Sequence, residues 1–347
     1  MMSANRLAID AMAMAPPMTG VPTVIAEIAR ALVTHAPEIE TRVFRPFEKM
    51  PRLLRVACEQ FVLPVFLLAR RPRVLLAPAY VAPLLAPCET WLVIHDLHVF
   101  THPETCSLLN RWHYRMLIPP SLRKAKRVFV LSRHTRDILL ARFPHVADKV
   151  EVLPVGIPRD MTYVPDVARR AACHERYGLP EKFFLFVGSL HPRKNLPRLM
   201  EAVSRLPEDA ALVMVGAASR DAARVLKNIR ANPRRFTWLG FVPQDDMACL
   251  YSSTHALVLP SLDEGLGLPV LEAMACYCPV LAALGPAQEF FPEAPMCDPL
   301  STDSIERELR RLWQDDTFCH ELSGQAARHA EKLSWRETAR FITGRLA

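Results

Sequence analysis

The chain has 347 residues, of which 50% are apolar and 23% are charged, and its formal net charge is +7. This is the composition of an ordinary globular protein, and the length suits two domains that each bury a core. The longest uncharged runs, Ala11–Ala26 and Val74–Cys88, contain prolines and are shorter than the roughly 20 residues of a membrane-spanning helix. Asp10 and these prolines also interrupt the apolar core of any signal peptide, so a cytoplasmic protein with reduced cysteines is expected.

The first half of the chain alternates strand-like and helix-like segments, which predicts parallel βαβ units with helices on both faces of a sheet. Its predicted strands are Arg6–Asp10, Ile39–Phe44, Arg73–Leu76, Trp91–His95, Arg127–Leu131 and Lys149–Leu153. Its predicted helices are Val21–His35, Pro51–Arg70, Ser107–Lys124 and Arg133–Arg142, the last of them capped by Ser132.

A proline-broken stretch, residues 154–180, separates this series from a second alternating series. The second series has predicted strands at Phe183–Val187, Ala211–Val215, Phe236–Leu239, Ala256–Leu259 and Val280–Ala282, with helices between them. Further helices are predicted at Asp303–Trp313, Thr317–Leu333 and Trp335–Leu346. Ligands of such sheets bind outside the carboxyl ends of the strands, so two domains of this kind are expected to form a cleft.

The segment Leu257–Ala275 has the layout of a ligand site. A short apolar strand runs into a turn with Gly265 and Gly267, and a helix opening with Pro269 follows. Backbone N–H groups and the positive end of a helix dipole meet at such a turn, where phosphate binds. Glu264 and Glu272 flank this anion pocket, and hydroxyl groups of a nucleotide sugar would give both carboxylates a role. A solvated loop residue and a surface helix residue are the alternative interpretation.

The run from Glu264 to Ala275, EGLGLPVLEAMA, resembles the signature of the retaining glycosyltransferases of family four, which have the GT-B fold. The segments FLFVGSLHPRKNLPRLMEA, VIHDL, LSRHTRDIL and VLPVGI are also similar to parts of that family. The resemblance implies an α/β protein of two Rossmann-like domains, each a doubly wound parallel sheet, facing across a cleft. Residues 1–165 would bind the acceptor and residues 178–333 the nucleotide-sugar donor, and the closing helix, residues 335–347, would pack back on the first domain.

Neutralising the diphosphate of a donor requires cations, and the chain has no Asp-x-Asp pair to hold a metal. Arg193 and Lys194 follow a buried strand and precede a helix that Asn195 is expected to cap. A solvated basic turn is the alternative. The family resemblance implies that Glu264 is catalytic and that Glu272 binds the ribose. It also implies that the donor contacts Ser189, Arg193, Lys194, Gly240, Phe241, Gly265, Leu266, Gly267 and Leu268.

The chain departs from the family pattern at several points. Ser189 stands where many relatives have arginine, so Arg193 would supply that charge. Pro22 replaces a glycine in the first loop, and Tyr277 replaces the glycine that usually follows the signature helix. The run AQEFFPEAP, Ala287–Pro295, replaces another common motif. The last two departures are expected near the donor pocket, where they could alter the choice of donor.

The acceptor side is predicted from fewer signals. His95 and Asp96 end an apolar strand, and a histidine there can polarise a hydroxyl or stabilise a leaving phosphate. A structural role for this pair is the alternative. The resemblance at VIHDL implies that His95 is catalytic and that Asp96 orients it. Gly20 matches the family's first glycine loop, which places it near the acceptor or a phosphate.

The positive charge lies in the first half of the chain, which suggests an anionic partner there. No zinc finger, KH or RRM signature is present, so nucleic acid is not expected. Residues 51–73 mix leucines and arginines, which favours either a peripheral contact with an anionic membrane or packing against the domain's own sheet.

These observations predict a metal-independent, retaining glycosyltransferase with no cofactor. It would move a hexose from a nucleotide sugar to a glycan or lipid-linked acceptor in cell-envelope polysaccharide synthesis. The PRKN loop resembles relatives that use GDP-mannose, so mannose is the first donor sugar predicted, with a UDP-sugar as the alternative. A nucleotide-sugar epimerase and a catalytically silent binding subunit are the other functions considered.

Overall fold

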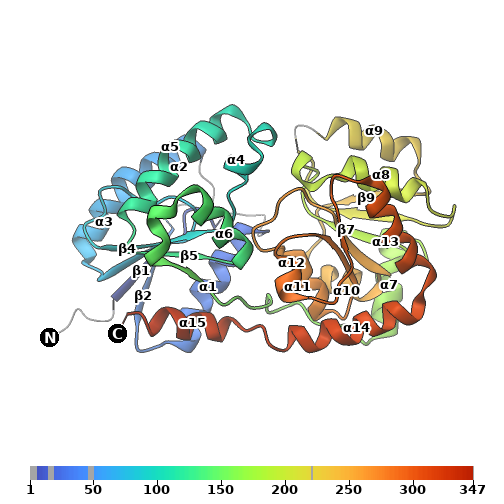
Figure 1. Ribbon diagram of the computed structural model, residues 1–347. Coiled ribbons are helices and arrows are strands. Elements are labelled where there is room, and N and C mark those ends of the chain that lie inside the picture. The colour runs from blue at the N-terminus through green and yellow to red at the C-terminus, as the bar shows by residue number, and fades with distance from the viewer. Residues whose placement is uncertain (1–5, 15–18, 46–50, 220–221, 347) are drawn as a thin grey trace. The chain divides into compact units, whose positions relative to one another are not determined.

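The computed structural model describes residues 6–14, 19–45, 51–219 and 222–346. The chain divides into two compact units (Figure 1). Unit 1 is Met1–Gly156 with Leu333–Ala347, and unit 2 is Ile157–Lys332. Residues 15–18 lie outside the described residues. They belong to the first uncharged run and include the start of the glycine loop before Gly20.

Unit 1 is built on a six-stranded parallel sheet in the order β2-β1-β3-β4-β5-β6. Its strands are β1 (Arg6–Asp10), β2 (Glu40–Phe44), β3 (Val74–Ala77), β4 (Glu89–Ile94), β5 (Arg127–Val130) and β6 (Val150–Val152). The strand order reverses between β1 and β3, whose register pairs Leu7 with Val74 and Ile9 with Leu76. Such a reversal opens a crevice at the carboxyl edge of a parallel sheet.

Helices cover both faces of this sheet. The longer ones are α1 (Val21–His35), α5 (Leu108–Lys124), α6 (Arg133–Arg142) and α15 (Trp335–Thr343), and α4 (His98–Thr101) is a single turn. Helix α1 buries Ile25, Ile28 and Leu32 completely, and α15 packs against it. The chain therefore returns to unit 1 at α15, after unit 2 is complete.

The segment after β2 was predicted as one helix, but the structure divides it. Helix α2 (Arg52–Ala57) passes through a π-helical turn, Cys58–Val62, into α3 (Leu63–Arg70). The π-helical turn ends just before Pro64, which cannot donate an amide hydrogen bond to the preceding turn. Leu63 and Leu67 are buried on the sheet side of this segment.

Unit 2 contains the second six-stranded parallel sheet, in the order β12-β11-β10-β7-β8-β9. Its strands are β7 (Phe184–Val187), β8 (Leu212–Val215), β9 (Phe236–Gly240), β10 (Ala256–Leu259), β11 (Val280–Ala283) and β12 (Met296–Cys297). Counted from β7, this is the 3-2-1-4-5-6 order of dinucleotide-binding folds, and it reverses between β7 and β10. All residues of β8 and β10 are buried, as expected for strands covered on both faces.

The helices of unit 2 include one that the sequence analysis does not predict. Helix α7 (Val167–Tyr177) lies inside the proline-broken stretch, capped by the Asp166 side chain and ended by Gly178 in the left-handed conformation. The others are α8 (Leu196–Ser204), α9 (Ala223–Ala231), α10 (Gln244–Ser253), α11 (Leu268–Ala275), α12 (Ala287–Phe290), α13 (Thr302–Gln314) and α14 (Asp316–Ala330).

The predicted class is confirmed, because both units are α/β with doubly wound parallel sheets. In the part of the chain that the structure describes, no helix combines the length and the apolar character needed to span a bilayer.

Candidate functional site

The turn between β10 and α11 is built for close backbone approach. Gly267 has a φ of 72°, in the left-handed region that glycine enters without a steric penalty. Leu268 and Pro269 form the first turn of α11, where the missing proline N–H costs no hydrogen bond. Gly265, Leu266 and Leu268 are buried. The N-terminus of an eight-residue helix therefore lies at the carboxyl edge of the unit 2 sheet.

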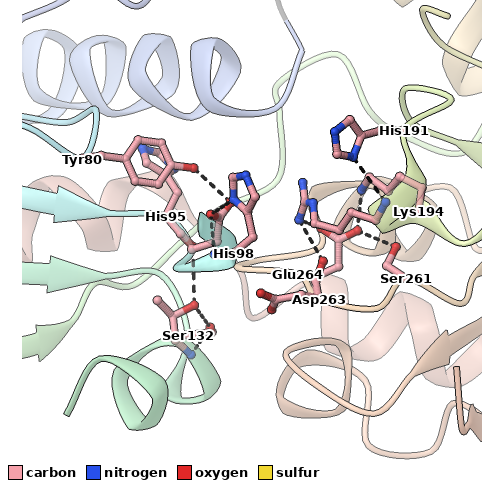
Figure 2. Close-up of polar contacts among 12 residues, drawn as sticks. Tyr80, His95, His98, Ser132, His191, Lys194, Ser261, Asp263 and Glu264 are labelled. Atoms are coloured by element: carbon pink, nitrogen blue, oxygen red, sulfur yellow. Dashed lines mark hydrogen bonds and ion pairs between the residues drawn. The ribbon is translucent and has the colours of Figure 1, made fainter. Parts of the chain in front are cut away.

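Glu264 lies in this turn between a hydroxyl and two cations (Figure 2). The Ser261 hydroxyl donates a 2.7 Å hydrogen bond to its Oε1, and Lys194 Nζ forms an ion pair with the same oxygen. Arg193 Nη1 lies 3.5 Å from Oε2. Burial alone would raise the pKa of Glu264, but the charges of Lys194 and Arg193 outweigh it, and the pKa lies below its ordinary value.

The basic loop after β7 is braced against the turn that carries Glu264. The Leu262 N–H donates to the Arg193 carbonyl at 2.8 Å, and Arg193 Nη1 donates to the Asp263 carbonyl at 2.8 Å. Lys194 is only 8% exposed. Because β7 and β10 are neighbours where the strand order reverses, both loops meet at the switch point of the unit 2 sheet. The predicted cations and the predicted carboxylate therefore form one cluster.

Asn195 occupies the predicted cap position of α8, but its side chain does not cap the helix. It has a left-handed φ of 60°, and its Nδ2 donates to the carbonyls of Pro260 at 3.0 Å and Pro299 at 2.6 Å. The capping prediction is therefore wrong in its mechanism. Because its backbone is left-handed, the side-chain amide of Asn195 points away from the first turn of α8. It instead connects the basic loop to the end of β10 by hydrogen bonds.

Glu272 has a separate environment on α11, where the residue is half-buried. Its Oε2 accepts a 2.7 Å hydrogen bond from the Tyr251 hydroxyl of α10. Burial raises the pKa of Glu272 to about 7, and the Tyr251 hydrogen bond only partly opposes this shift. Burial also holds the pKa of Tyr251 well above its usual range and that of Cys276 at about 12. Of Glu272, Tyr251 and Cys276, Glu272 is thus the group that changes charge near neutral pH.

We expect Glu272→Gln to stabilise the protein more at pH 8 than at pH 4.5. The folded pKa of about 7 exceeds the ordinary value of 4.5, so the carboxyl group stays protonated to a higher pH in the folded state than in the unfolded state. The free energy of unfolding therefore falls as pH rises between these values, by at most about 3 kcal/mol, and the amide removes that loss. Chemical denaturation at several pH values measures the difference. An equal gain at both pH values, or a matching gain in the exposed control Glu208→Gln, contradicts the prediction.

Glycines mark the carboxyl ends of three neighbouring strands in unit 2. Gly188, Gly216 and Gly240 follow or end β7, β8 and β9, and all three have a positive φ. A Cβ on Gly216 would lie 2.1 Å from the carbonyl oxygen of Gly188, so no larger residue fits there. Beside these glycines, Ser189 is exposed and Phe241 is 63% exposed. Gly188 and Gly216 were not predicted as site residues, although a glycine directly after an apolar strand often marks a close approach of a ligand or another backbone.

His95 and Asp96, two of the predicted acceptor-side residues, follow β4 in unit 1 (His95 is labelled in Figure 2). His95 is buried, its Nε2 is 2.6 Å from the Pro78 carbonyl oxygen, and burial lowers its pKa. The Asp96 carboxylate accepts a 3.0 Å hydrogen bond from the Tyr80 hydroxyl and pairs with His98 Nδ1. Tyr80 and His98 were not predicted. His98 lies two residues beyond Asp96 and falls at the same sheet edge.

Gly20 is exposed at the start of α1 with a φ of 62°, and a Cβ placed on it would meet no other atom within 4 Å. In unit 2, the cluster Arg193, Lys194, Ser261 and Glu264 assembles as one group, whereas Glu272 has its own partner in Tyr251. The two glutamates, predicted to flank one pocket, are therefore held by different neighbours. Among the described residues, no three His, Cys, Asp or Glu side chains gather as metal ligands would.

Comparison with known proteins supports the same family. Residues 174–329 match the family model described as glycosyl transferases group 1. The O-antigen chain mannosyltransferase B of Escherichia coli is 27% identical over 251 residues, which is 70% of this chain and 65% of that protein. The matches span 32% to 65% of the length of the first curated relatives.

Solved structures extend the likeness over both units. Sucrose-phosphate synthase (tll1590) from Thermosynechococcus elongatus has a TM-score of 0.79 at 18% identity, covering 98% of each chain. Anabaena Alr3699/HepE in complex with UDP and glucose has a TM-score of 0.75 at 18% identity, covering 99% of each chain. Residues 174–329 are therefore similar to the group 1 glycosyl transferases, and both units together have the fold of these solved structures.

Proposed function

We propose that the protein transfers a hexose from a nucleoside-diphosphate sugar to a saccharide acceptor, with retention of configuration and without a metal ion. The cluster of Glu264 with Lys194 and Arg193 at the switch point of unit 2 carries this proposal. It places two cations and one carboxylate beside the N-terminus of α11. A diphosphate needs the cations and the helix N-terminus, and a reacting sugar needs the carboxylate.

The cluster suggests how a donor would be held. Glu264 balances both cations, so a diphosphate would have to share them with the carboxylate. Once Lys194 and Arg193 face phosphate oxygens, Glu264 can accept hydrogen bonds from sugar hydroxyls and stabilise positive charge on the ring. Backbone groups of residues 265–268 would contact the sugar and the phosphates.

The nucleoside end would lie along the remaining edge of the same sheet. Glu272 would accept hydrogen bonds from the ribose, and Gly240 and Phe241 would lie beside the base, with Ser189 close to the phosphates. The E. coli relative is an O-antigen chain mannosyltransferase, which favours a GDP-mannose donor. The Anabaena complex holds UDP and glucose, which keeps a UDP-sugar as the alternative.

A thermal-shift screen with GDP, UDP, ADP and TDP, each with EDTA, tests the proposal. A ligand that binds only the folded state raises its stability by RT ln(1 + [L]/Kd), so one nucleotide should give the largest shift. The largest shift with GDP supports mannosyl transfer, and the largest shift with UDP moves the donor to a UDP-sugar. No shift with any nucleotide, either with EDTA or when Mg²⁺ replaces the EDTA, contradicts a transferase and favours a silent binding subunit. A shift that needs a divalent ion contradicts metal independence.

We also propose that unit 1 rests on an anionic membrane surface. Apolar side chains at least half exposed project from α2, the π-helical turn, α3 and α5. They are Leu54, Phe61, Val62, Val65, Leu68, Leu108, Leu109, Trp112 and Met116, and we call them the apolar face. Arg70 and Arg71 end α3 beside it and are exposed. Apolar residues next to arginines suit the boundary between acyl chains and anionic headgroups, which supports a lipid-linked acceptor.

We expect the wild type to co-sediment with phosphatidylglycerol-containing vesicles. The triple variant Phe61→Ser, Val65→Ser, Trp112→Ser should bind at least about tenfold more weakly, because each apolar side chain contributes roughly 1.5–3 kcal/mol when buried. Val33→Ser is the matched control, since Val33 is exposed on α1, outside the apolar face. Equal loss in the control, or no vesicle binding by the wild type, contradicts the membrane proposal.

A further inference from the structure

Glu272 is held differently from Glu264, because among the described residues it has no cation to balance its charge. Two cations form ion pairs with Glu264, whereas burial and a hydrogen bond from Tyr251 are what shift the pKa of Glu272. Glu272 is half-buried on α11, so its ionised form loses hydration without gaining an ion pair. A carboxylate in this position lowers the free energy of unfolding near neutral pH, and perturbed groups of this kind are common at functional sites.

Tyr251 donates its hydrogen bond to Glu272 from the neighbouring helix. Helices α10 and α11 are in contact, and the Tyr251 hydroxyl lies 2.7 Å from Glu272 Oε2 (both helices are labelled in Figure 1). Tyr251 is completely buried, at 0% exposure, so its hydroxyl is a donor in a fixed place. This hydrogen bond favours the ionised form of Glu272. Tyr251 therefore restricts both the orientation and the protonation of the carboxyl group.

The Glu272 carboxylate keeps acceptor positions for a ligand. An ionised carboxylate has about four lone-pair sites, and within the described residues Glu272 makes one side-chain hydrogen bond, to Tyr251. Glu272 lies about one turn after Pro269, and helical side chains leave the backbone in the direction of the helix N-terminus. The carboxylate is therefore directed toward the carboxyl edge of the sheet, where two adjacent hydroxyls of a ribose ring would donate to it.

We propose that Tyr251 is a positioning residue that holds Glu272 to accept hydrogen bonds from the 2′- and 3′-hydroxyls of the donor's ribose. This inference rests on the proposed function, because Glu272 would be the ribose contact of the nucleotide sugar. It deepens that function by naming the class of donor, a ribonucleoside diphosphate sugar. A deoxyribonucleotide, such as deoxythymidine diphosphate, would lose a hydrogen bond at Glu272 and bind more weakly.

Titration calorimetry with the full chain at pH 8 tests the inference. The probes are GDP and UDP, each compared with its 2′,3′-dideoxy form. The ribose preference is the Kd of the dideoxy form divided by the Kd of the parent nucleotide. For the nucleotide that binds more tightly, we expect a preference of at least about tenfold in the wild type, because the dideoxy form lacks two hydrogen bonds to a charged group.

Tyr251→Phe should lower the ribose preference at least about threefold and leave the affinity for the dideoxy form unchanged. A merely structural role of Tyr251 would weaken both forms alike. No preference in the wild type, or equal weakening of both forms in the variant, overturns the inference.

Tyr177→Phe is the matched control. The Tyr177 hydroxyl donates a 2.6 Å hydrogen bond to Asp246 near the other end of α10, so this variant removes the same kind of bond from the same helix. The ribose preference should stay unchanged in it. In a Glu272→Ala background, Tyr251→Phe should cause no further loss of preference, because Tyr251 acts through the carboxylate. An equal loss in Tyr177→Phe, or a further loss in the double variant, overturns the inference.

The pH dependence of the ribose preference gives a test that needs no variant. The pKa of Glu272 is about 7, so the preference should fall between pH 8.5 and pH 6 as the carboxylate is protonated. Titration of the nucleotide phosphates cancels in the ratio. The thiols of Cys276 and Cys278, which act on Tyr251, stay neutral because burial raises their pKa values well above this range.

Tyr251→Phe should move this fall to higher pH by at least about half a pH unit, because the phenol no longer stabilises the ionised carboxyl group. A preference that does not change with pH in the wild type overturns the inference, and this result decides the question if Tyr251→Phe fails to fold by circular dichroism.

The outcomes keep this inference separate from the proposed function. Nucleotide binding without a ribose preference retains the transferase and overturns the role of Tyr251. Binding of neither nucleotide, with EDTA or with Mg²⁺, contradicts the transferase and the inference together.

Discussion

Replacing Glu264 with Gln should lower the rate of hexosyl transfer by about 10²- to 10³-fold. The amide keeps the size of the side chain and can still accept a hydrogen bond from Ser261, but it carries no charge to stabilise a positive sugar ring in the transition state. Initial rates with a labelled donor measure this loss. Full activity in Glu264→Gln would remove Glu264 from the chemistry, and a similar loss in Glu208→Gln would show that the assay responds to any change of charge.

Glu264→Ala is the less informative change. Its expected effect from sequence alone is loss of transfer with an intact fold, but the structure adds a cost in stability. The side chain is 15% exposed and pairs with two cations, so its removal leaves their positive charge without this carboxylate. Breaking a buried pair in this way costs about 3–5 kcal/mol. The Gln variant loses these ion pairs as well, but it keeps the side-chain volume and the hydrogen bond from Ser261, so we expect a lower melting temperature for the Ala variant than for the Gln variant.

Replacing Arg193 and Lys194 together with Ala should weaken nucleoside diphosphate binding by roughly 10²- to 10⁴-fold. Each charge-assisted hydrogen bond contributes about 1.5–3 kcal/mol, and every 1.4 kcal/mol corresponds to a factor of ten in affinity. Titration calorimetry with the nucleotide that gives the largest thermal shift measures the change.

Single variants distinguish the contributions of Arg193 and Lys194 to nucleotide affinity. Arg193 also holds the Asp263 carbonyl, so Arg193→Lys should keep part of the charge effect but loosen this brace. Lys194→Ala removes a cation without touching that carbonyl. Lys227→Ala, an exposed cation of α9 in the same unit, is the control. Unchanged affinity in the double variant would place the phosphates elsewhere in the protein.

Most strands of the chain were predictable because their signals are local. The strands β1, β10 and the helix α1 have the predicted bounds, since apolar runs and capping residues occur within a few positions of each other. Helix α7 was missed although Asp166 and Gly178 mark its ends. The prolines on either side interrupt the sequence, so its short amphipathic pattern was not recognised as a helix.

The cluster around Glu264 was predictable in its members but not in its contacts. The chain order of Arg193, Lys194 and Glu264 relative to their strands placed all three at one sheet edge. The left-handed backbone of Asn195, which removes its side chain from the helix cap, follows from packing against the end of β10.

Unit 1 cannot be finished until unit 2 has been synthesised. Its sheet begins with β1, but α15, which packs on α1, comes after all of unit 2. Thr338 donates a 2.6 Å hydrogen bond to the Pro154 carbonyl, and Arg345 pairs with Glu151 of β6. A nascent chain therefore exposes the α1 surface on the ribosome while unit 2 folds. During translation, unit 1 is therefore begun before unit 2 and completed after it.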